Sequence, residues 1–391
     1  MQAKLDMPAV LAALQCVLPA GLERVALHEP EFQGQEWSYL KNCLDTGYVS
    51  TVGRYVDRFE DQLAQVTGAR HAVAVVNGTA ALHTALRLVS VGAGDEVLLP
   101  ALTFVATANA VAYCNATPHF VDSEERTLGV DPRKLEAYLR DIAELRGEVC
   151  INRRTGRPVR ALIVVHTFGH PVDIDPLAEI CERFRLVMIE DAAQSLGSLY
   201  KGRHAGTFAR LAALSFNGNK IVTTGGGGAI LTNDSALAER AKHITTTARV
   251  PHPWRYAHDE LGYNYRMPNI NAALGCAQLE RLESFVERKR NLHSSYRQAF
   301  AAVNGVRVFT EPEYARSNYW LNVLLLEPEL AAYREELLKF THGNGILTRP
   351  AWVLLHRLPM YSQAPRADLT TAEDLESRMI NLPSSAFLNA R

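Results

Sequence analysis

A single lysine, Lys220, stands between a short apolar run and four consecutive glycines. The apolar run, residues 213–216, predicts a strand, and the polar residues 217–219 predict a turn that ends it. The glycines at 225–228 let the backbone approach a neighbour closely or adopt a positive φ. Lys220 is then either a solvated turn lysine beside a glycine bulge, or a Schiff-base lysine whose amine becomes nucleophilic when its surroundings lower its pKa.

Gly78 and Thr79 begin a segment of helical spacing that directly follows the apolar run 71–76. The free N–H groups and the positive end of the dipole at such a helix start attract a phosphate, and the Thr79 hydroxyl can add a donor. The alternative is an ordinary helix cap, a position where Asn and Thr are also preferred. This window alone leaves both interpretations open.

Asp191 ends the apolar run 187–191, where a carboxylate is unfavourable unless it is paired. Its partner could be a protonated ring nitrogen of a ligand, and the alternative is the cap of a following helix. Gln194 lies three residues further on and could donate to a ring oxygen. Phe104 follows the run 96–100 and could lie against an aromatic ring, although an aromatic residue there is also typical of a core.

Together these residues could supply a phosphate-binding helix start, an aromatic side chain for a ring face, an acid for a ring nitrogen and an amine for a carbonyl. Pyridoxal phosphate needs such groups. The acid keeps the pyridine nitrogen protonated, so that the ring accepts electrons when a carbanion forms. The lysine holds the aldehyde and, once released, carries protons. The sequence therefore predicts Lys220 and Asp191 as catalytic residues.

Two other chemistries are disfavoured. His166 and His170 have the spacing of metal ligands on a helix, but the apolar run before them and the Thr-Phe-Gly between them indicate a strand followed by a loop, so no metal is expected. A Ser/His/Asp hydrolase is also disfavoured, because neither Ser198 nor Ser384 stands in a G-x-S-x-G elbow.

The elements that position these residues alternate between strands and helical segments. Such alternation is the signature of an α/β fold with a mostly parallel sheet covered by helices on both faces. In an open parallel sheet, ligands bind beyond the carboxyl ends of the strands, which places the candidate residues on one rim. Seven apolar runs are predicted as strands: residues 71–76, 96–100, 118–122, 161–166, 187–191, 213–216 and 229–232.

The chain divides into three predicted parts. Residues 1–30 form a helical lead-in, residues 31–250 a large cofactor-binding domain, and residues 251–391 a smaller α+β domain. In the last part we expect one long helix over residues 271–291, strands at 307–310 and 319–326, and a helix over 328–340.

Composition limits the function. The chain has 391 residues, of which 47% are hydrophobic and 21% charged, so a sizeable core is expected. The formal net charge of −1 argues against a nucleic-acid binder. The six cysteines form no C-x-x-C pair, which favours a reducing compartment, and we expect a cytoplasmic protein. We expect no signal peptide and no membrane span.

Five motifs occur together in one order and resemble those of the DegT/DnrJ/EryC1/StrS family of nucleotide-sugar aminotransferases. The resemblance extends from about residue 30 to residue 385. The motifs are NGTAAL at 77–82, PALTFVAT at 100–107, IEDAAQ at 189–194, SFNGNK at 215–220 and GYNYRM at 262–267.

The resemblance implies the type I aminotransferase fold, a homodimer and pyridoxal phosphate. It implies that Lys220 is the Schiff-base lysine and that Asp191 pairs with the pyridine nitrogen. The remaining cofactor contacts that it implies are Gln194 at the ring hydroxyl, Phe104 against the ring, Gly78, Thr79 and Ser215 at the phosphate, and Asn264 reaching the phosphate from the other subunit.

Within the family, the segments 47–53 and 118–128 are most similar to the branch linked to legionaminic acid and bacillosamine-type sugars of surface glycans such as O-antigens. This branch implies amination of C4 of a UDP-2-acetamido-2,6-dideoxy-4-ketohexose, with glutamate as donor. A nucleotide diphosphate needs cationic and donor groups, and the candidates are Arg255 on one loop, and Arg349, Trp352 and His356 on another.

The chain departs from the family at one point. Many members have Gly-Glu-Gly-Gly after the lysine, whereas residues 225–228 are all glycine here. Two alternatives within the family are a pyridoxal phosphate-dependent sugar dehydratase and a non-catalytic regulatory relative. The dehydratases replace the lysine with histidine, so Lys220 argues against that alternative.

Overall fold

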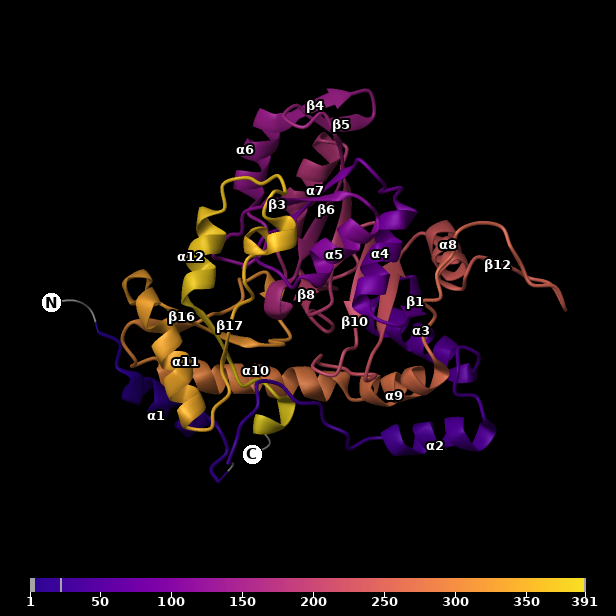
Figure 1. The fold of residues 1–391 in the computed structure, drawn as a ribbon. Coiled ribbons are helices and arrows are strands. Elements are labelled where there is room, and N and C mark those ends of the chain that lie inside the picture. The colour runs from indigo at the N-terminus through magenta and orange to yellow at the C-terminus, as the bar shows by residue number, and fades with distance from the viewer. Residues whose placement is uncertain (1–3, 22, 390–391) are drawn as a thin grey trace.

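The computed structural model describes residues 4–21 and 23–389 (Figure 1). Its central sheet has the strand order β1-β11-β10-β7-β6-β2-β3. Neighbours from β10 to β3 are parallel, whereas β11 is antiparallel to both β10 and β1. The mostly parallel sheet and all seven predicted strands are confirmed as β1 (His71–Val75), β2 (Glu96–Pro100), β3 (Thr117–Val121), β6 (Pro158–Val165), β7 (Val187–Asp191), β10 (Leu211–Ser215) and β11 (Gly228–Thr232).

The sheet has nine strands, so the predicted number of seven is wrong. The additional strands, β4 (Ala143–Arg146) and β5 (Val149–Asn152), form an antiparallel hairpin, and β5 also pairs with β6. Gly147, with φ of 60°, makes the turn between them. This hairpin lacks the continuous apolar run of a buried strand, because most of β4 is exposed to solvent.

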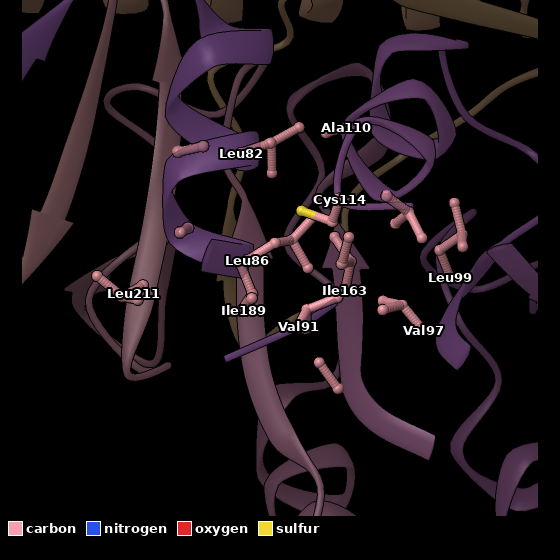
Figure 2. Packing of buried hydrophobic residues seen from close by; sticks show 14 of the residues in the cluster. Leu82, Leu86, Val91, Val97, Leu99, Ala110, Cys114, Ile163, Ile189 and Leu211 are labelled. Atoms are coloured by element: carbon pink, nitrogen blue, oxygen red, sulfur yellow. The ribbon is translucent and has the colours of Figure 1, made fainter. Parts of the chain in front are cut away.

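Successive side chains along each strand point to opposite faces of the sheet, so a hydrophobic core forms on each face. Val73 and Val75 of β1 pack with one set of helices, while Ala72 and Ala74 pack with the other. Figure 2 shows the first core, in which side chains of α4 lie beside those of β6 and β7. The first face is covered by α4 (Gly78–Leu88), α5 (Ala106–Tyr113) and α8 (Ser235–Thr245), and the second by α3 (Arg54–Thr67), α6 (Pro132–Ile142), α7 (Ile174–Arg183) and α9 (Asn269–Leu279).

The long helix expected over 271–291 is wrong as a single element. It is two helices, α9 and α10 (Leu282–Phe300), that follow one another along the lower edge of Figure 1. The break falls at Arg281, whose φ of −111° and ψ of 1° leave the helical range. No Pro or Gly marks this break. Arg281 instead turns to pair with the buried Glu31, 2.7 Å away.

The C-terminal part is α+β, as expected. Its four-stranded antiparallel sheet has the order β14-β16-β18-β17, and α1 and α10 pack on one side of it. Strand 319–326 begins only at Asn322, and the helix expected over 328–340 is a 3-10 turn followed by α11. The elements are α1 (Met7–Val17), β14 (Val306–Val308), β16 (Asn322–Leu326), α11 (Arg334–Gly343), β17 (Arg349–Pro350), α12 (Thr370–Arg378) and β18 (Met379–Leu382).

The predicted helical lead-in 1–30 is helical only over α1 in the described residues, and Val25 beyond it bridges to Ile346. The predicted domain limits at residues 30 and 250 stay predictions. No helix among the described residues is long and apolar enough to cross a membrane. The remaining short elements are α2 (Glu36–Thr46), β8 (Leu199–Tyr200), β9 (Arg203–His204), β12 (Arg249–Val250), β13 (Ala257–His258) and β15 (Ala315–Arg316).

Candidate active site

A cavity of about 270 Å³ opens at the carboxyl ends of β7 and β10. Asp191 is the last residue of β7 and Ser215 the last of β10, and the two strands are parallel neighbours. The start of α4 forms another wall. The sequence-predicted residues that line this cavity are Gly78, Thr79, Phe104, Asp191, Gln194, Ser215, Lys220 and Trp352.

Lys220 follows a tight turn in which its backbone N–H donates to the carbonyl of Asn217, 2.9 Å away. Its amine lies 3.9 Å from the centre of the Trp320 ring. Burial lowers the pKa of Lys220 to about 8, against the opposing effect of the Asp191 charge, which raises it. A lysine of ordinary pKa is almost fully protonated near neutral pH, whereas this amine is half deprotonated at about pH 8. It is therefore suited to attack a carbonyl.

Asp191 is buried and its two carboxylate oxygens have different donors. Oδ2 accepts a hydrogen bond of 2.7 Å from the Thr107 hydroxyl, and Oδ1 accepts one of 3.2 Å from the Ala193 N–H. Burial raises the pKa of Asp191, and these hydrogen bonds and the charge of Lys220 oppose the rise. Among the described residues no cation forms an ion pair with this carboxylate, so it can accept a positively charged group from a ligand.

The start of α4 has the geometry of an anion site. The N-cap is Asn77, whose side chain accepts from the Ala80 N–H at 2.8 Å. The N–H groups of Gly78 and Thr79 belong to the first turn, which has no partners within the helix. A Cβ on Gly78 would lie 2.9 Å from the Cβ of Ser215, so only glycine lets the helix start approach the end of β10 this closely.

The glycines at 225–228 have different structural roles. Gly225 has a φ of 77°, and a Cβ on Gly228 would lie 2.4 Å from the backbone carbon of Asn77. Gly228 therefore allows β11 to pass directly beneath the start of α4. Gly226 lines the cavity, and a Cβ there would meet nothing closer than the Val76 carbonyl at 4.0 Å. Glycine is not sterically required at this position.

Aromatic side chains cover another wall of the cavity. Phe104 is 50% exposed, and its ring centre lies 6.2 Å from that of Trp352. Trp352 in turn stacks on the buried Phe168 at 4.8 Å. Gln194 is buried, and its Oε1 accepts from the Phe168 N–H at 2.7 Å, which leaves its amide group free to donate. A flat ring can enter between these groups and the strand ends.

Four predicted residues do not line this cavity. Asn264 is exposed and bridges to Thr246. Arg255 is exposed in the segment 249–258 around β12 that extends away from the body in Figure 1, and its Nε lies 3.0 Å from His252. Arg349 is exposed on β17. His356 is mostly buried and lies 3.2 Å from the carboxylate of Glu373.

The sequence reasoning missed two cavity residues of consequence, Thr107 and Trp320. Thr107 lies in the motif 100–107, one helical turn after Thr103, to which it is hydrogen bonded at 3.3 Å. This spacing is the feature of the sequence that could have pointed to Thr107. Trp320 lies within the run 319–326 that the sequence predicts as a strand, and nothing in that run singles it out.

His166 and His170 do not form a metal site. His166 Nε2 lies 3.0 Å from Glu190, whose carboxylate also accepts three backbone N–H groups from Gly206, Phe208 and Ala209. His170 lies against the rings of Phe309 and Tyr319, and neither of its ring nitrogens has a hydrogen-bond partner among the described residues. Each histidine is held in a different environment, and neither lines the cavity.

The residues present fit pyridoxal phosphate. The Gly78–Ser215 approach leaves space beside free N–H donors, which suits a phosphate group. The buried Asp191 lacks a cation and suits a protonated ring nitrogen. Lys220 presents an amine of lowered pKa in the same cavity, which suits an aldehyde.

Comparisons with known proteins agree with this chemistry. The model of the DegT/DnrJ/EryC1/StrS aminotransferase family matches residues 30–390. The chain is 39% identical over 370 residues to EpsN of Bacillus subtilis, which carries the name of a pyridoxal phosphate-dependent aminotransferase, covering 93% of this chain and 92% of EpsN. It is also 39% identical to a GDP-perosamine synthase of Caulobacter vibrioides, covering 94% and 95%. Among solved structures, Helicobacter pylori PseC, an aminotransferase involved in pseudoaminic acid biosynthesis, superposes with a TM-score of 0.84 at 25% identity, covering 94% and 95%.

Proposed function

Because the chain belongs to the DegT/DnrJ/EryC1/StrS aminotransferase family and is a pyridoxal phosphate-dependent aminotransferase, we propose that it aminates C4 of a nucleotide-linked 4-keto-6-deoxy sugar. The observation that carries the proposal is that one cavity holds the Lys220 amine, the buried Asp191 carboxylate and the start of α4. These are the three groups that hold the aldehyde, the ring nitrogen and the phosphate of the cofactor.

The proposed cofactor contacts follow from this arrangement. Gly78, Thr79 and Ser215 bind the phosphate, with N–H and hydroxyl donors at the positive end of the α4 dipole. Gln194 donates to the ring hydroxyl, and Phe104 lies against the ring. In a homodimer, which is part of the proposal, Asn264 reaches the phosphate from the second subunit, since on its own chain it does not line the cavity.

When bound, pyridoxal phosphate supplies a carbon for covalent attachment of amines and a ring that accepts electrons. Asp191, whose ionised form is favoured by the hydrogen bonds from Thr107 and Ala193, would keep a positive charge at the ring nitrogen. Lys220 Nζ, with its lowered pKa, both accepts and returns a proton near neutral pH. One lysine therefore serves the donor half-reaction and the sugar half-reaction, and the expected kinetics are ping-pong.

The nucleotide sugar is proposed to enter over the aromatic wall. Trp352 belongs to that wall, and its indole offers a flat face to a sugar or a base. Arg349 and His356 flank Trp352 in the sequence and supply a cation and a polar ring. Arg255, on the extended segment 249–258, is proposed to contact the diphosphate.

The specific substrate that we propose is a UDP-2-acetamido-2,6-dideoxy-4-ketohexose, with glutamate as the amino donor, in the making of a surface-glycan amino sugar in the cytoplasm. A second candidate is a GDP-linked 4-keto-6-deoxyhexose. It is favoured by the relatives named GDP-perosamine synthase, of which the one from Escherichia coli O157:H7 is 37% identical to this chain over 368 residues.

The first experiment tests the chemistry. Purified protein is expected to show a yellow band that borohydride bleaches, and peptide mass spectrometry should locate the reduced cofactor on Lys220. Lys220→Met, in which the amine is removed, should show neither. A cofactor fixed on another lysine, or a protein that binds none, would overturn the assignment.

The second experiment tests the substrate. UDP- and GDP-linked 4-ketosugars are each supplied with glutamate, and the products are identified by mass spectrometry and NMR. An amino group at C4 with parallel initial-rate lines supports the proposal, and the better nucleotide decides between the two candidates. A dehydrated product points to the sugar dehydratase, and a protein without turnover points to a regulatory relative.

A further inference from the structure

Trp320 touches the lysine turn through two different parts of its side chain. Its indole N–H donates to the carbonyl of Asn219, the residue before Lys220, at 2.7 Å. Its ring centre lies 3.9 Å from Lys220 Nζ. Trp320 is 4% exposed and lines the same cavity. One side chain from the C-terminal third of the protein thus contacts both the backbone and the amine of the lysine turn.

Two buried side chains, Asn318 and Lys289, hydrogen bond to the backbone of Trp320. Its backbone N–H donates to Asn318 Oδ1 at 2.8 Å, and its carbonyl accepts from Lys289 Nζ at 3.1 Å. Lys289 is fully buried on α10 and also donates to the carbonyl of Ser384. Burial holds the pKa of Lys289 well below its usual range. A neutral amine has two N–H groups, which matches these two carbonyl acceptors.

Asn318 extends the same network to the cofactor side. Its Nδ2 donates to the carbonyls of Gln194 and Leu196, each at 2.9 Å. The loop after β7 and the turn after β10 are therefore both tied to the segment that carries Trp320. A buried network of this kind, with each member hydrogen bonded, fixes a single geometry.

We propose that Trp320 is a positioning residue for Lys220, that its ring face favours the protonated amine, and that the buried Lys289 keeps Trp320 in place. This inference rests on the proposed role of Lys220. An ammonium group over the face of an indole is attracted by the ring's negative centre, and the attraction strengthens when water is excluded. Trp320 therefore opposes the effect of burial and keeps the amine within the range where it can exchange protons.

The other groups that act on this amine are few. Asp191 across the cavity raises the pKa of Lys220. His28 is partly buried, and burial, Lys289 and Lys220 all lower its pKa. The hydrogen bonds of Trp320 go to Asn219, Asn318 and Lys289, so its substitution removes neither of the two bonds that Asp191 accepts.

The test uses the full chain freed of pyridoxal phosphate, and its readout is the rate at which a small amine-reactive reagent labels Lys220, measured by peptide mass spectrometry across pH. The midpoint of the wild-type profile is expected at about 8. Trp320→Leu, which removes the ring face, should lower the midpoint by about 0.5–1 pH units. Trp320→Phe, which keeps a ring face, should move it by less than half as much. Both variants lose the indole N–H, so amide exchange in the turn 217–220 should be faster in both.

Lys289→Met tests the support behind Trp320. It should lower the midpoint in the same direction as Trp320→Leu, and the double variant should show no more than the Trp320→Leu shift, since Lys289 acts through Trp320. The control is Trp37→Leu, an equal change at a residue that is 76% exposed on α2, and it should leave the profile unchanged. Circular dichroism identifies any variant that fails to fold, and Trp320→Phe is the mildest of the set.

An unchanged midpoint in Trp320→Leu overturns the proposal, and so does a rise, which would mean that the ring acts only by excluding water. Additive shifts in the double variant overturn the role of Lys289. Because the assay needs neither cofactor nor sugar, these outcomes are independent of whether the proposed aminotransfer reaction is found.

Discussion

Thr107→Val should weaken the binding of pyridoxal phosphate in a manner that depends on pH. The Thr107 hydroxyl donates at 2.7 Å to Asp191 Oδ2, and this is one of the two hydrogen bonds that favour the ionised carboxylate. Burial already raises the pKa of Asp191. Valine has nearly the shape of threonine but no donor, so it raises this pKa further while it leaves the packing of α5 intact.

The expected size of the pKa change follows from the negative charge of the Asp191 carboxylate, which accepts the hydrogen bond. A hydrogen bond to a charged group contributes about 1.5–3 kcal/mol, which corresponds to a rise of roughly 1–2 units in the pKa of Asp191. The protonated form cannot pair with a protonated ring nitrogen, so a proton competes with the cofactor. The ratio of dissociation constants, variant over wild type, should approach 1 at high pH and rise toward roughly 10- to 100-fold as the pH falls.

The assay is a fluorescence or absorbance titration of the cofactor-free protein with pyridoxal phosphate, repeated from mildly acidic to mildly alkaline pH. Thr107→Ser keeps the hydroxyl and should stay close to wild type. Thr84→Val is the matched control, because Thr84 is fully buried on α4 and its hydroxyl has no hydrogen-bond partner in the part of the chain that the structure describes. Its ratio should remain near 1 at every pH.

Two results would refute this reasoning. One is a Thr107→Val protein that binds the cofactor as tightly as wild type at the lowest pH at which both are folded. The other is a weakening that does not vary with pH, which would mean that Thr107 matters for packing and not for the ionisation of Asp191.

Three further predictions concern stability and turnover. Asp191→Asn should lower turnover by about 100-fold or more, measured as initial rate, and raise the melting temperature of the cofactor-free protein at neutral pH. The gain in melting temperature should disappear at acidic pH, because a carboxyl whose folded pKa is raised is neutral in both states there. Gly228→Ala should destabilise the protein by at least about 1–3 kcal/mol in urea unfolding, since its Cβ would lie 2.4 Å from Asn77, whereas Gly226→Ala should change stability by less than about 0.5 kcal/mol. His170 has its pKa lowered to about 3 by burial, so it contributes stability above its unfolded pKa that is lost as the pH falls toward 3, and His170→Leu should shift acid unfolding to lower pH.

Each of these has a result that contradicts it. An Asp191→Asn protein with a lower melting temperature would mean that the carboxylate is stabilised by its two donors more than burial opposes it. Equal costs at Gly228 and Gly226 would show that β11 does not need its close approach to α4. An unchanged acid midpoint in His170→Leu would show that other groups control acid unfolding.

The sequence could predict the parts of this protein that depend on neighbouring residues along the chain. The seven strands are continuous apolar runs because they are buried on both faces, and buried runs are visible without knowing what covers them. Lys220, Asp191 and Gly78 could be found because each lies at the end of such a run or a few residues after it. Topology then brings strand ends together at one edge of the sheet.

What could not be predicted depends on contacts between distant segments. Trp320 stands in an apolar run, and only the fold reveals that its indole reaches the carbonyl of Asn219. At the break between α9 and α10, Arg281 pairs with Glu31, which is far away in the sequence. The strands of the hairpin β4–β5 have four residues each, and the second half of β4 is exposed, so they lack the longer buried apolar runs of the other strands of this sheet.

The same difference separates two groups of residues in the site. Gly78, Asp191 and Ser215, which are among the residues proposed for the cofactor, lie on strand ends and on the start of one helix, where the backbone itself fixes the geometry. The aromatic residues Trp320 and Trp352 come from the C-terminal third and close the same cavity from the other side. A change at Trp352 is expected to alter which sugar or nucleotide is accepted, whereas a change at Trp320 is expected to act on Lys220 as well. Since the first group is the one that sequence patterns reveal, the reaction class can be predicted from the sequence while the exact hexose cannot.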